Sequence, residues 1–154
     1  MTTGFRGQSV RRLEDERFLV GRGCFIEDID VPGQAWMQVV RSPHAHARIT
    51  AVEAGHAAAM PGVLGVFTAA DLAELGPLPC TVRVASVQPM ASPPHPALAA
   101  DRVRHVGDPV AFVVAASRDA ARNAAEAVMV EYDMLPAVTD PAAALRAGAP
   151  QLWD

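Results

Sequence analysis

The feature that most constrains this chain is a continuous apolar run from Pro109 to Ala116, PVAFVVAA, followed at once by a helix-forming segment. An unbroken apolar run of this length is typical of a strand that is covered on both faces. Ser117 is placed to cap the helix that follows. The apolar face of that helix would consist of Ala120, Ala121, Ala124, Ala125 and Val128. Arg122 and Glu126, four residues apart, would lie on its solvent face.

Shorter patterns flank this unit on both sides. Strands are predicted at residues 25–29, 35–41, 49–52, 63–67 and 128–132, and a short Ala-rich helix at 53–60. Thr68 and Asp71 have the spacing of a helix start. Asp140, Pro141 and Gly148 frame a last short helix. Strands that alternate with short helices predict an α+β fold, with a mixed sheet in a single domain.

Three segments have little regular pattern. Residues 1–24 form a Gly- and Arg-rich lead-in, which we expect to be extended and to contact partners. Val31-Pro32-Gly33-Gln34 has the residues of a tight turn, with Pro at its second position and Gly at its third. Residues 74–96 contain six prolines and predict a long irregular loop, and loops of this length are usually functional or disordered.

Composition excludes several classes of protein. The net charge is −4 and only 5% of residues are aromatic, which argues against a nucleic-acid-binding module. No apolar stretch reaches the roughly 18 residues that a membrane span needs. Cys24 and Cys80 are too few for a disulfide scaffold or a cysteine-ligated metal. Arg11-Arg12 is followed by the charged residues 14–17 instead of an apolar segment, so we expect a cytoplasmic protein.

One cluster of polar residues stands out. Arg41, His44, His46 and Arg48 lie beside the end of a predicted strand, where they could form the polar rim of a docking surface. His44 and His46 also allow a metal site, but a catalytic zinc needs a third protein ligand, which the sequence does not identify. An ordinary turn, in which the imidazoles bond to backbone or face water, explains the same residues. No catalytic residue is predicted.

Four segments together resemble a known family. They are residues 12–29, with RLED and LVGRG; residues 40–49, VRSPHAHARI; residues 61–72, with PGV and FTAADL; and residues 106–138, from VGDPVA to VEYDMLPAV. In this order and spacing they are similar to the N-terminal α/β hammerhead domain of the molybdenum hydroxylase large subunits. That family includes xanthine dehydrogenase, aldehyde oxidase and aerobic carbon monoxide dehydrogenase. The similarity covers nearly the whole chain.

The resemblance implies a hammerhead domain over residues 25–150, with residues 151–154 starting the connection to a cofactor domain. It implies that molybdopterin cytosine dinucleotide, iron–sulfur clusters and FAD are carried by partner domains or subunits, and that none is bound by this chain alone. The partners would be a molybdenum-cofactor domain or subunit, an iron–sulfur subunit and a flavin subunit. The role left to this chain is that of a scaffold, with loop 74–96 as a candidate wall of the substrate approach.

Two other functions remain open at this stage. A free-standing binding or assembly protein could use the same fold without belonging to a hydroxylase, because fold does not fix function. A small metalloenzyme built on His44 and His46 is the third alternative. The sequence does not distinguish a split subunit from a fragment, nor does it identify a substrate.

Overall fold

The computed structural model describes residues 7, 9–82 and 90–153. The chain divides into two compact units, Met1–Gln34 and Ala35–Asp154. The first unit contains helix α1 (Asp15–Leu19) and the 3-10 helix η1 (Ile26–Asp28). None of its described side chains is buried. Helix α1 interrupts the lead-in that the sequence suggested was extended.

The prediction of a strand at residues 25–29 is wrong, because residues 26–28 form the 3-10 helix η1. Instead, the Asp28 carboxylate accepts a hydrogen bond of 3.0 Å from the backbone N–H of Phe25, and this bond closes the turn of η1. The ring of Phe25 stacks on that of Phe18 with 5.6 Å between centroids. The turn after it is confirmed: Gln34 donates its N–H to the Val31 carbonyl, and Gly33 has a φ of 80°, which favours glycine.

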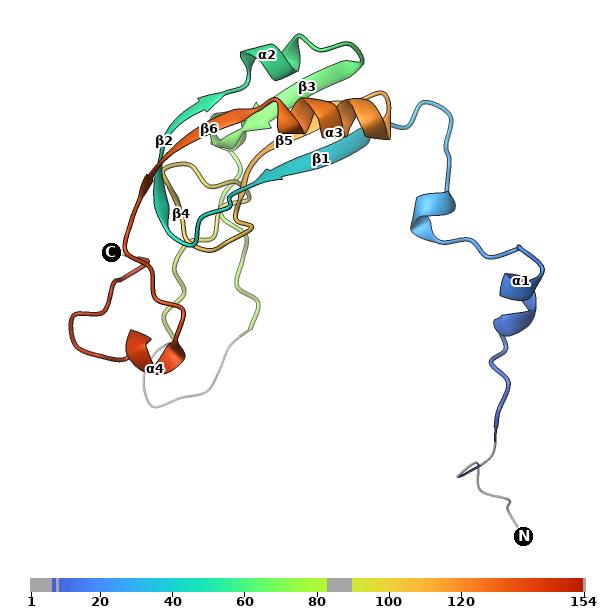
Figure 1. The fold of residues 1–154 in the computed structure, drawn as a ribbon, viewed down its shortest axis with the longest axis horizontal. Coiled ribbons are helices and arrows are strands. Elements are labelled where there is room, and N and C mark those ends of the chain that lie inside the picture. The colour runs from blue at the N-terminus through green and yellow to red at the C-terminus, as the bar shows by residue number, and fades with distance from the viewer. Residues whose placement is uncertain (1–6, 8, 83–89, 154) are drawn as a thin grey trace. The chain divides into compact units, whose positions relative to one another are not determined.

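The second unit contains two antiparallel sheets of three strands each (Figure 1). The first sheet has the order β1-β5-β3, and the second has the order β4-β2-β6. The strands are β1 (Trp36–Arg41), β2 (Ala47–Glu53), β3 (Val63–Thr68), β4 (Arg102–Val103), β5 (Pro109–Ala115) and β6 (Met129–Met134). The helices are α2 (Gly55–Ala58), the 3-10 helix η2 (Ala69–Leu72), α3 (Arg118–Glu126) and α4 (Pro141–Ala144). The predicted α+β class is confirmed, and the strand pairs of the described residues are all antiparallel.

Strand β5 is the centre of the first sheet. Its residues Ala111, Val113 and Ala115 are fully buried. Val113 packs in a core cluster with Ala57 of α2 and Ala124 of α3, so one face of the sheet is covered by helices. Helix α3 lies across β1 and β5 on that face (Figure 1).

The opposite face of β5 is only partly covered. Successive strand residues point to opposite sides, so Phe112 and Val114 lie on the face away from α3, and both are half-buried. The expectation that β5 is covered on both faces is therefore wrong for the described residues. The register places Met37 opposite Val114, and Phe67 opposite Phe112. The rings of Phe67 and Phe112 stack with 4.9 Å between centroids.

A second core cluster joins the two sheets. Its buried members are Ala47 of β2, Ala99, Val103 of β4 and Val110 of β5. Val110 therefore belongs to a strand of the first sheet and packs against the second. The missed strand β4 is only two residues long, too short for a recognisable sequence pattern.

The helix ends follow their capping residues. Ser117 accepts a hydrogen bond of 3.2 Å from the N–H of Ala120, as predicted for the start of α3. Asp140 accepts from the N–H groups of Ala142 and Ala143, which confirms the start of α4. The helix start at Thr68 is confirmed by η2, where the Thr68 hydroxyl and N–H both donate to the Asp71 carboxylate, at 3.0 and 2.7 Å.

Several boundaries shift by a few residues. Helix α2 covers 55–58 rather than 53–60, because β2 extends through Glu53. Strand β6 begins and ends later than predicted, at 129–134. No described helix is long and apolar enough to cross a membrane.

The unequal covering of the two faces of β5 can be tested by paired substitutions. Val113→Ala removes two methyl groups from the buried face and is expected to lower the free energy of unfolding by roughly 2 kcal/mol. Val114→Ala, on the half-buried face, is expected to cost less than about 1 kcal/mol. Urea unfolding followed by circular dichroism measures both values. Equal losses for the two variants would contradict the assignment of the faces.

Candidate functional site

The segment between β1 and β2 is held against the loop at residues 105–108. Ser42 is 2% exposed, and its backbone N–H donates to the Asp108 carbonyl at 2.9 Å. Its own carbonyl accepts from the N–H of Gly107 at 2.8 Å. Arg41 adds a third bond, from Nη1 to the Gly107 carbonyl at 2.8 Å. The Ser-Pro step therefore begins a turn that is fixed at both ends to residues far away in the chain.

The turn is also fixed from within. The Ser42 hydroxyl accepts from the N–H of His44 at 3.0 Å and lies 3.2 Å from its carbonyl. The His44 ring stands edge-on to Tyr132, with 4.9 Å between centroids and 71° between planes. These contacts leave His44 half-buried against strand β6.

His46 is 6% exposed and anchors the end of the turn. Its Nδ1 lies 2.8 Å from the Pro136 carbonyl oxygen. A carbonyl only accepts, so Nδ1 carries the proton of this bond. The backbone carbonyl of His46 accepts from the N–H of Leu135 at 2.9 Å.

The four residues of the predicted docking cluster thus have two different placements. Arg41 and Arg48 are exposed, whereas His44 and His46 face inward and support the turn. The imidazoles make the backbone and packing contacts of an ordinary turn. Over residues 7, 9–82 and 90–153, no group of three or more His, Cys, Asp or Glu side chains could hold a metal ion.

Sequence reasoning missed three residues that shape this site: Ser42, Asp108 and Tyr132. Asp108 is 8% exposed, and its carboxylate accepts from the N–H of Arg104 at 2.8 Å and lies 3.6 Å from Nδ1 of His105. Burial raises the pKa of Tyr132, the Ser42 hydroxyl lowers it, and the charge of Asp108 raises it. All three residues lie within the RSPHAHA, VGDPVA and VEYDMLP segments that carry the family resemblance. The sequence therefore marked these positions but did not indicate what each residue does.

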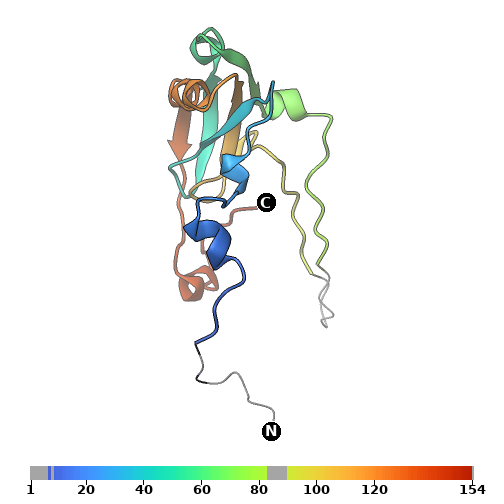
Figure 2. The same ribbon diagram turned by 90° about the vertical axis from the view of Figure 1, so that its right-hand side faces the viewer.

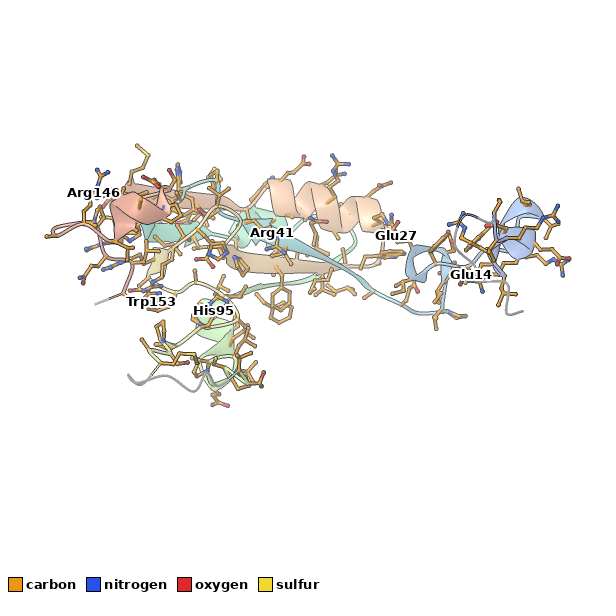
Figure 3. All side chains as sticks on the ribbon, turned by 90° about the horizontal axis from the view of Figure 1, so that it is seen from below. Glu14, Glu27, Arg41, His95, Arg146 and Trp153 are labelled. Carbon is orange, nitrogen blue, oxygen red and sulfur yellow. The ribbon has the colours of Figure 1, made fainter. Side chains whose placement is uncertain are left out.

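A hollow lies beside this site. It has a volume of about 270 Å³, and His95, Arg104, Asp108 and Trp153 are among its lining residues. The Arg104 guanidinium lies 3.7 Å from the centre of the Trp153 ring, and its Nε donates to the Leu152 carbonyl at 2.9 Å. Figure 3 shows Trp153 and His95 close together. The residues expected to start a connection are thus fixed to the folded body through Arg104.

The predicted loop 74–96 leaves the body as two adjacent legs (Figure 2). The N–H of Leu78 donates to the His95 carbonyl at 2.8 Å and joins the legs. Its residues 83–89 lie outside the described part of the chain. A neighbouring hollow of about 410 Å³ at the base of the loop is largely apolar, with Leu72, Leu75, Pro77, Pro94 and Leu98 among its lining.

The fold described above is that of a known protein family. Residues 20–136 match the family model described as "Aldehyde oxidase and xanthine dehydrogenase, a/b hammerhead domain". The match covers more than half of the chain, so the chain belongs to this family.

Relatives of known name support the same assignment. The nicotine 6-hydroxylase large subunit of Paenarthrobacter nicotinovorans is 40% identical over 149 residues, which are 96% of this chain and 18% of the relative. The carbon monoxide dehydrogenase large chain of Afipia carboxidovorans is 40% identical over 146 residues, 95% of this chain and 17% of the relative. The chain therefore spans less than a fifth of these relatives.

Solved structures of molybdenum hydroxylases support the same family assignment. Quinoline 2-oxidoreductase from Pseudomonas putida 86 superimposes with a TM-score of 0.80 at 44% identity, over 95% of this chain and 18% of that one. A Cu,Mo-CO dehydrogenase superimposes with a TM-score of 0.77 at 39% identity, over 94% of this chain and 17% of that one. The chain is homologous to a piece of the large subunits of molybdenum hydroxylases.

The environment of Tyr132 gives a direct test of the site, because it is the only tyrosine in the chain. Its phenolate absorbance should appear at a higher pH in the folded chain than in urea, where the midpoint is about 10. Asp108→Asn removes a charge that raises this pKa and should lower the midpoint, whereas Ser42→Ala should raise it. Spectrophotometric titration measures the midpoint in the parent chain and in both variants.

The same shift sets the sign of the pH dependence of stability. The folded chain keeps the Tyr132 proton to a higher pH than the unfolded chain does. Its contribution to stability is therefore complete below about pH 10 and is lost as the pH rises through the folded pKa. Equal midpoints in the folded and unfolded chains would contradict the burial of Tyr132 beside Asp108.

Proposed function

We propose that this chain is the hammerhead portion of a molybdenum hydroxylase large subunit and serves there as a non-catalytic scaffold. It docks against the part of the enzyme that carries the molybdenum cofactor, and the iron–sulfur and flavin subunits complete the assembly. The observation that carries this proposal is the similarity of nearly the whole chain to less than a fifth of the relatives' large subunits. The reaction would be hydroxylation of a carbon centre or oxidation of carbon monoxide.

The half-covered face of the first sheet supports a docking role. Met37, opposite Val114 on this face, is 61% exposed, and Phe67 is 36% exposed in its stack with Phe112. Exposed apolar groups that lie together on one sheet face mark an interaction surface. Burial of such a face against another domain would contribute roughly 25 cal/mol for each Å² of apolar surface removed from water.

The 41–48 turn supports the same role by a different chemistry. Ser42 and His46 are buried and fix the backbone, so the exposed side chains of Arg41 and Arg48 start from rigid positions. A fixed arginine loses less conformational entropy on docking than a mobile one. We assign these two arginines to a polar rim and the two histidines to its support.

We assign the molybdenum cofactor to a partner domain or subunit and not to this chain. Within the described ranges there is no candidate cluster of metal ligands. In the 270 Å³ hollow, Arg104 stacks on Trp153 and donates to the Leu152 carbonyl. No chemical step is assigned to this chain, and the cofactors are assigned to its partners.

The legs of loop 74–96 are the proposed wall of the substrate approach. They project from the body and are held by the Leu78–His95 bond, and an apolar hollow lies at their base. The proposed compartment of the assembly is the cytoplasm.

The scaffold role is tested by metal analysis. The 154-residue chain, produced in cells that make the molybdenum cofactor, is expected to contain no stoichiometric molybdenum and to show no dye-linked dehydrogenase activity. Plasma mass spectrometry of the purified chain measures the metal. One molybdenum per chain would contradict the proposed division of roles.

The apolar face is tested in the intact enzyme. Met37→Ser with Phe67→Ser is expected to lower the yield of assembled enzyme several-fold, because it removes apolar contact from the interface. Met129→Ser with Leu145→Ser is the matched control, since both side chains are exposed elsewhere on the body. Size-exclusion chromatography of the purified complex measures assembly. Equal yields of assembled enzyme from both double variants would contradict the proposal that this face is part of the interface.

A further inference from the structure

A groove runs between the edge strand β1 and helix α3. It has a volume of about 560 Å³. One wall is the last part of β1, from Gln38 to Arg41. The other wall is α3, which contributes Arg118, Arg122, Ala125 and Glu126. Figure 1 shows the two elements side by side, and Figure 3 labels Arg41 on β1.

The groove is positively charged, although the chain as a whole carries −4. Three guanidinium groups line it, those of Arg41, Arg118 and Arg122, against the single carboxylate of Glu126. Arg122 and Glu126 pair at 3.3 Å, but both side chains are more than two-thirds exposed, so the pairing is weak. Arg118 lies over the Trp36 ring, 4.7 Å from its centroid.

Strand β1 presents an open edge to this groove. It pairs with β5 on one side, and no strand of the described residues pairs with its other side. Natural edge strands are usually protected by charged residues, by proline or by short length. The outer strand β6 contains Glu131 and Asp133, whereas β1 reads WMQVV before Arg41 and has no charge in its first five residues.

The arginines are spread along the groove rather than gathered around one point. Arg118 lies over the first residue of β1, and Arg41 is its last residue. Six residues of strand span about 20 Å. A single phosphate or carboxylate could not contact both ends, whereas an extended peptide of about six residues could.

We infer that this groove binds an extended acidic segment of a partner subunit, which adds as a strand to the open edge of β1. The partner's backbone would hydrogen-bond to the edge, and its Asp and Glu side chains would pair with Arg118, Arg122 and Arg41. That the segment belongs to a subunit of the enzyme rests on the proposed function. The binding itself does not, because it depends only on the groove.

The groove is tested with labelled heptapeptides that alternate Glu or Lys with Val. The Glu peptide is expected to bind the 154-residue chain saturably and to weaken with added salt, and the Lys peptide not to bind. Arg118→Glu with Arg122→Gln should weaken binding at least about ten-fold, because it removes two of three positive charges and adds a negative one. Fluorescence anisotropy measures the affinities.

The matched control is Arg146→Glu. Arg146 is an exposed arginine outside the groove, and this variant should bind within about two-fold of the parent chain. The groove variant is designed to fold, since a glutamate in the first turn of α3 suits the helix dipole, and glutamine avoids repulsion from Glu126. Equal weakening in both variants would mean general charge attraction and would overturn the proposal.

Hydrogen exchange separates strand addition from simple anion binding. With the Glu peptide bound, amides of β1 should exchange more slowly, whereas those of the β6 edge should not change. Inorganic pyrophosphate is the competing probe. If pyrophosphate displaces the peptide at equal concentration and β1 is unprotected, the groove is a small-anion site and the proposal is wrong.

The partner is identified separately, by cross-linking within the purified enzyme complex. A photoreactive group at Gln38 should capture an acidic segment of another subunit. Peptide binding without this cross-link would retain the groove as a peptide site and contradict only its assignment to a subunit of the enzyme.

Discussion

The burial of strand β5 controls the rest of this structure. Its apolar residues on one side, with Val113 at the centre, pack against α2 and α3, and Val110 reaches the second sheet. Both core clusters therefore depend on this one strand. The residues on its other side, Phe112 and Val114, are equally apolar but only half-buried. A strand of this composition is typical of one that is covered on both faces, and the described residues cover one face fully and the other only in part.

The second constraint is the bond pattern that joins the 41–48 turn to the 105–108 loop. Ser42 exchanges backbone hydrogen bonds with Gly107 and Asp108, while His46 is bonded to Pro136. These contacts connect segments some 65 to 90 residues apart in sequence. They explain why a short polar turn contains a buried serine and a buried histidine. The histidines that suggest metal ligands are, in this structure, part of the support of the turn.

The apolar face, the rim arginines and the cationic groove suggest a molecule with several contact surfaces. The face would be covered by apolar packing, and the groove by charge and strand pairing. The two use different physical interactions, so each can be disrupted without the other. This separation is expected of a domain that lies between several neighbours in a larger enzyme.

Much of the fold could be predicted from the sequence, and the reasons are local. The run PVAFVVAA correctly predicts strand β5, although not its covering on both faces, and the caps Ser117 and Asp140 are confirmed. The prediction of a strand at residues 25–29 failed because the Asp28 carboxylate accepts a hydrogen bond from the Phe25 N–H and closes a turn. The apolar pattern alone does not reveal this bond. Strand β4 was missed because two residues carry no periodicity.

The candidate site was less predictable than the fold. The docking role proposed for Arg41, His44, His46 and Arg48 stays a prediction, and the structure separates the four into exposed and supporting residues. Asp108 and Tyr132 lie far from them in sequence, so only the folded chain brings these groups together. Family resemblance pointed to the correct segments, but it could not assign a role to each residue.

The measurement that tests the central claim most directly is the size and the partners of the native polypeptide that contains this sequence. Capture from source cells with an antibody against the chain, followed by mass spectrometry and molybdenum analysis, gives both. The account predicts a molybdenum-containing assembly, with this sequence either in a large subunit or in a small chain bound to one. A small chain recovered alone, without molybdenum or partner subunits, would contradict it and would favour a free-standing binding protein.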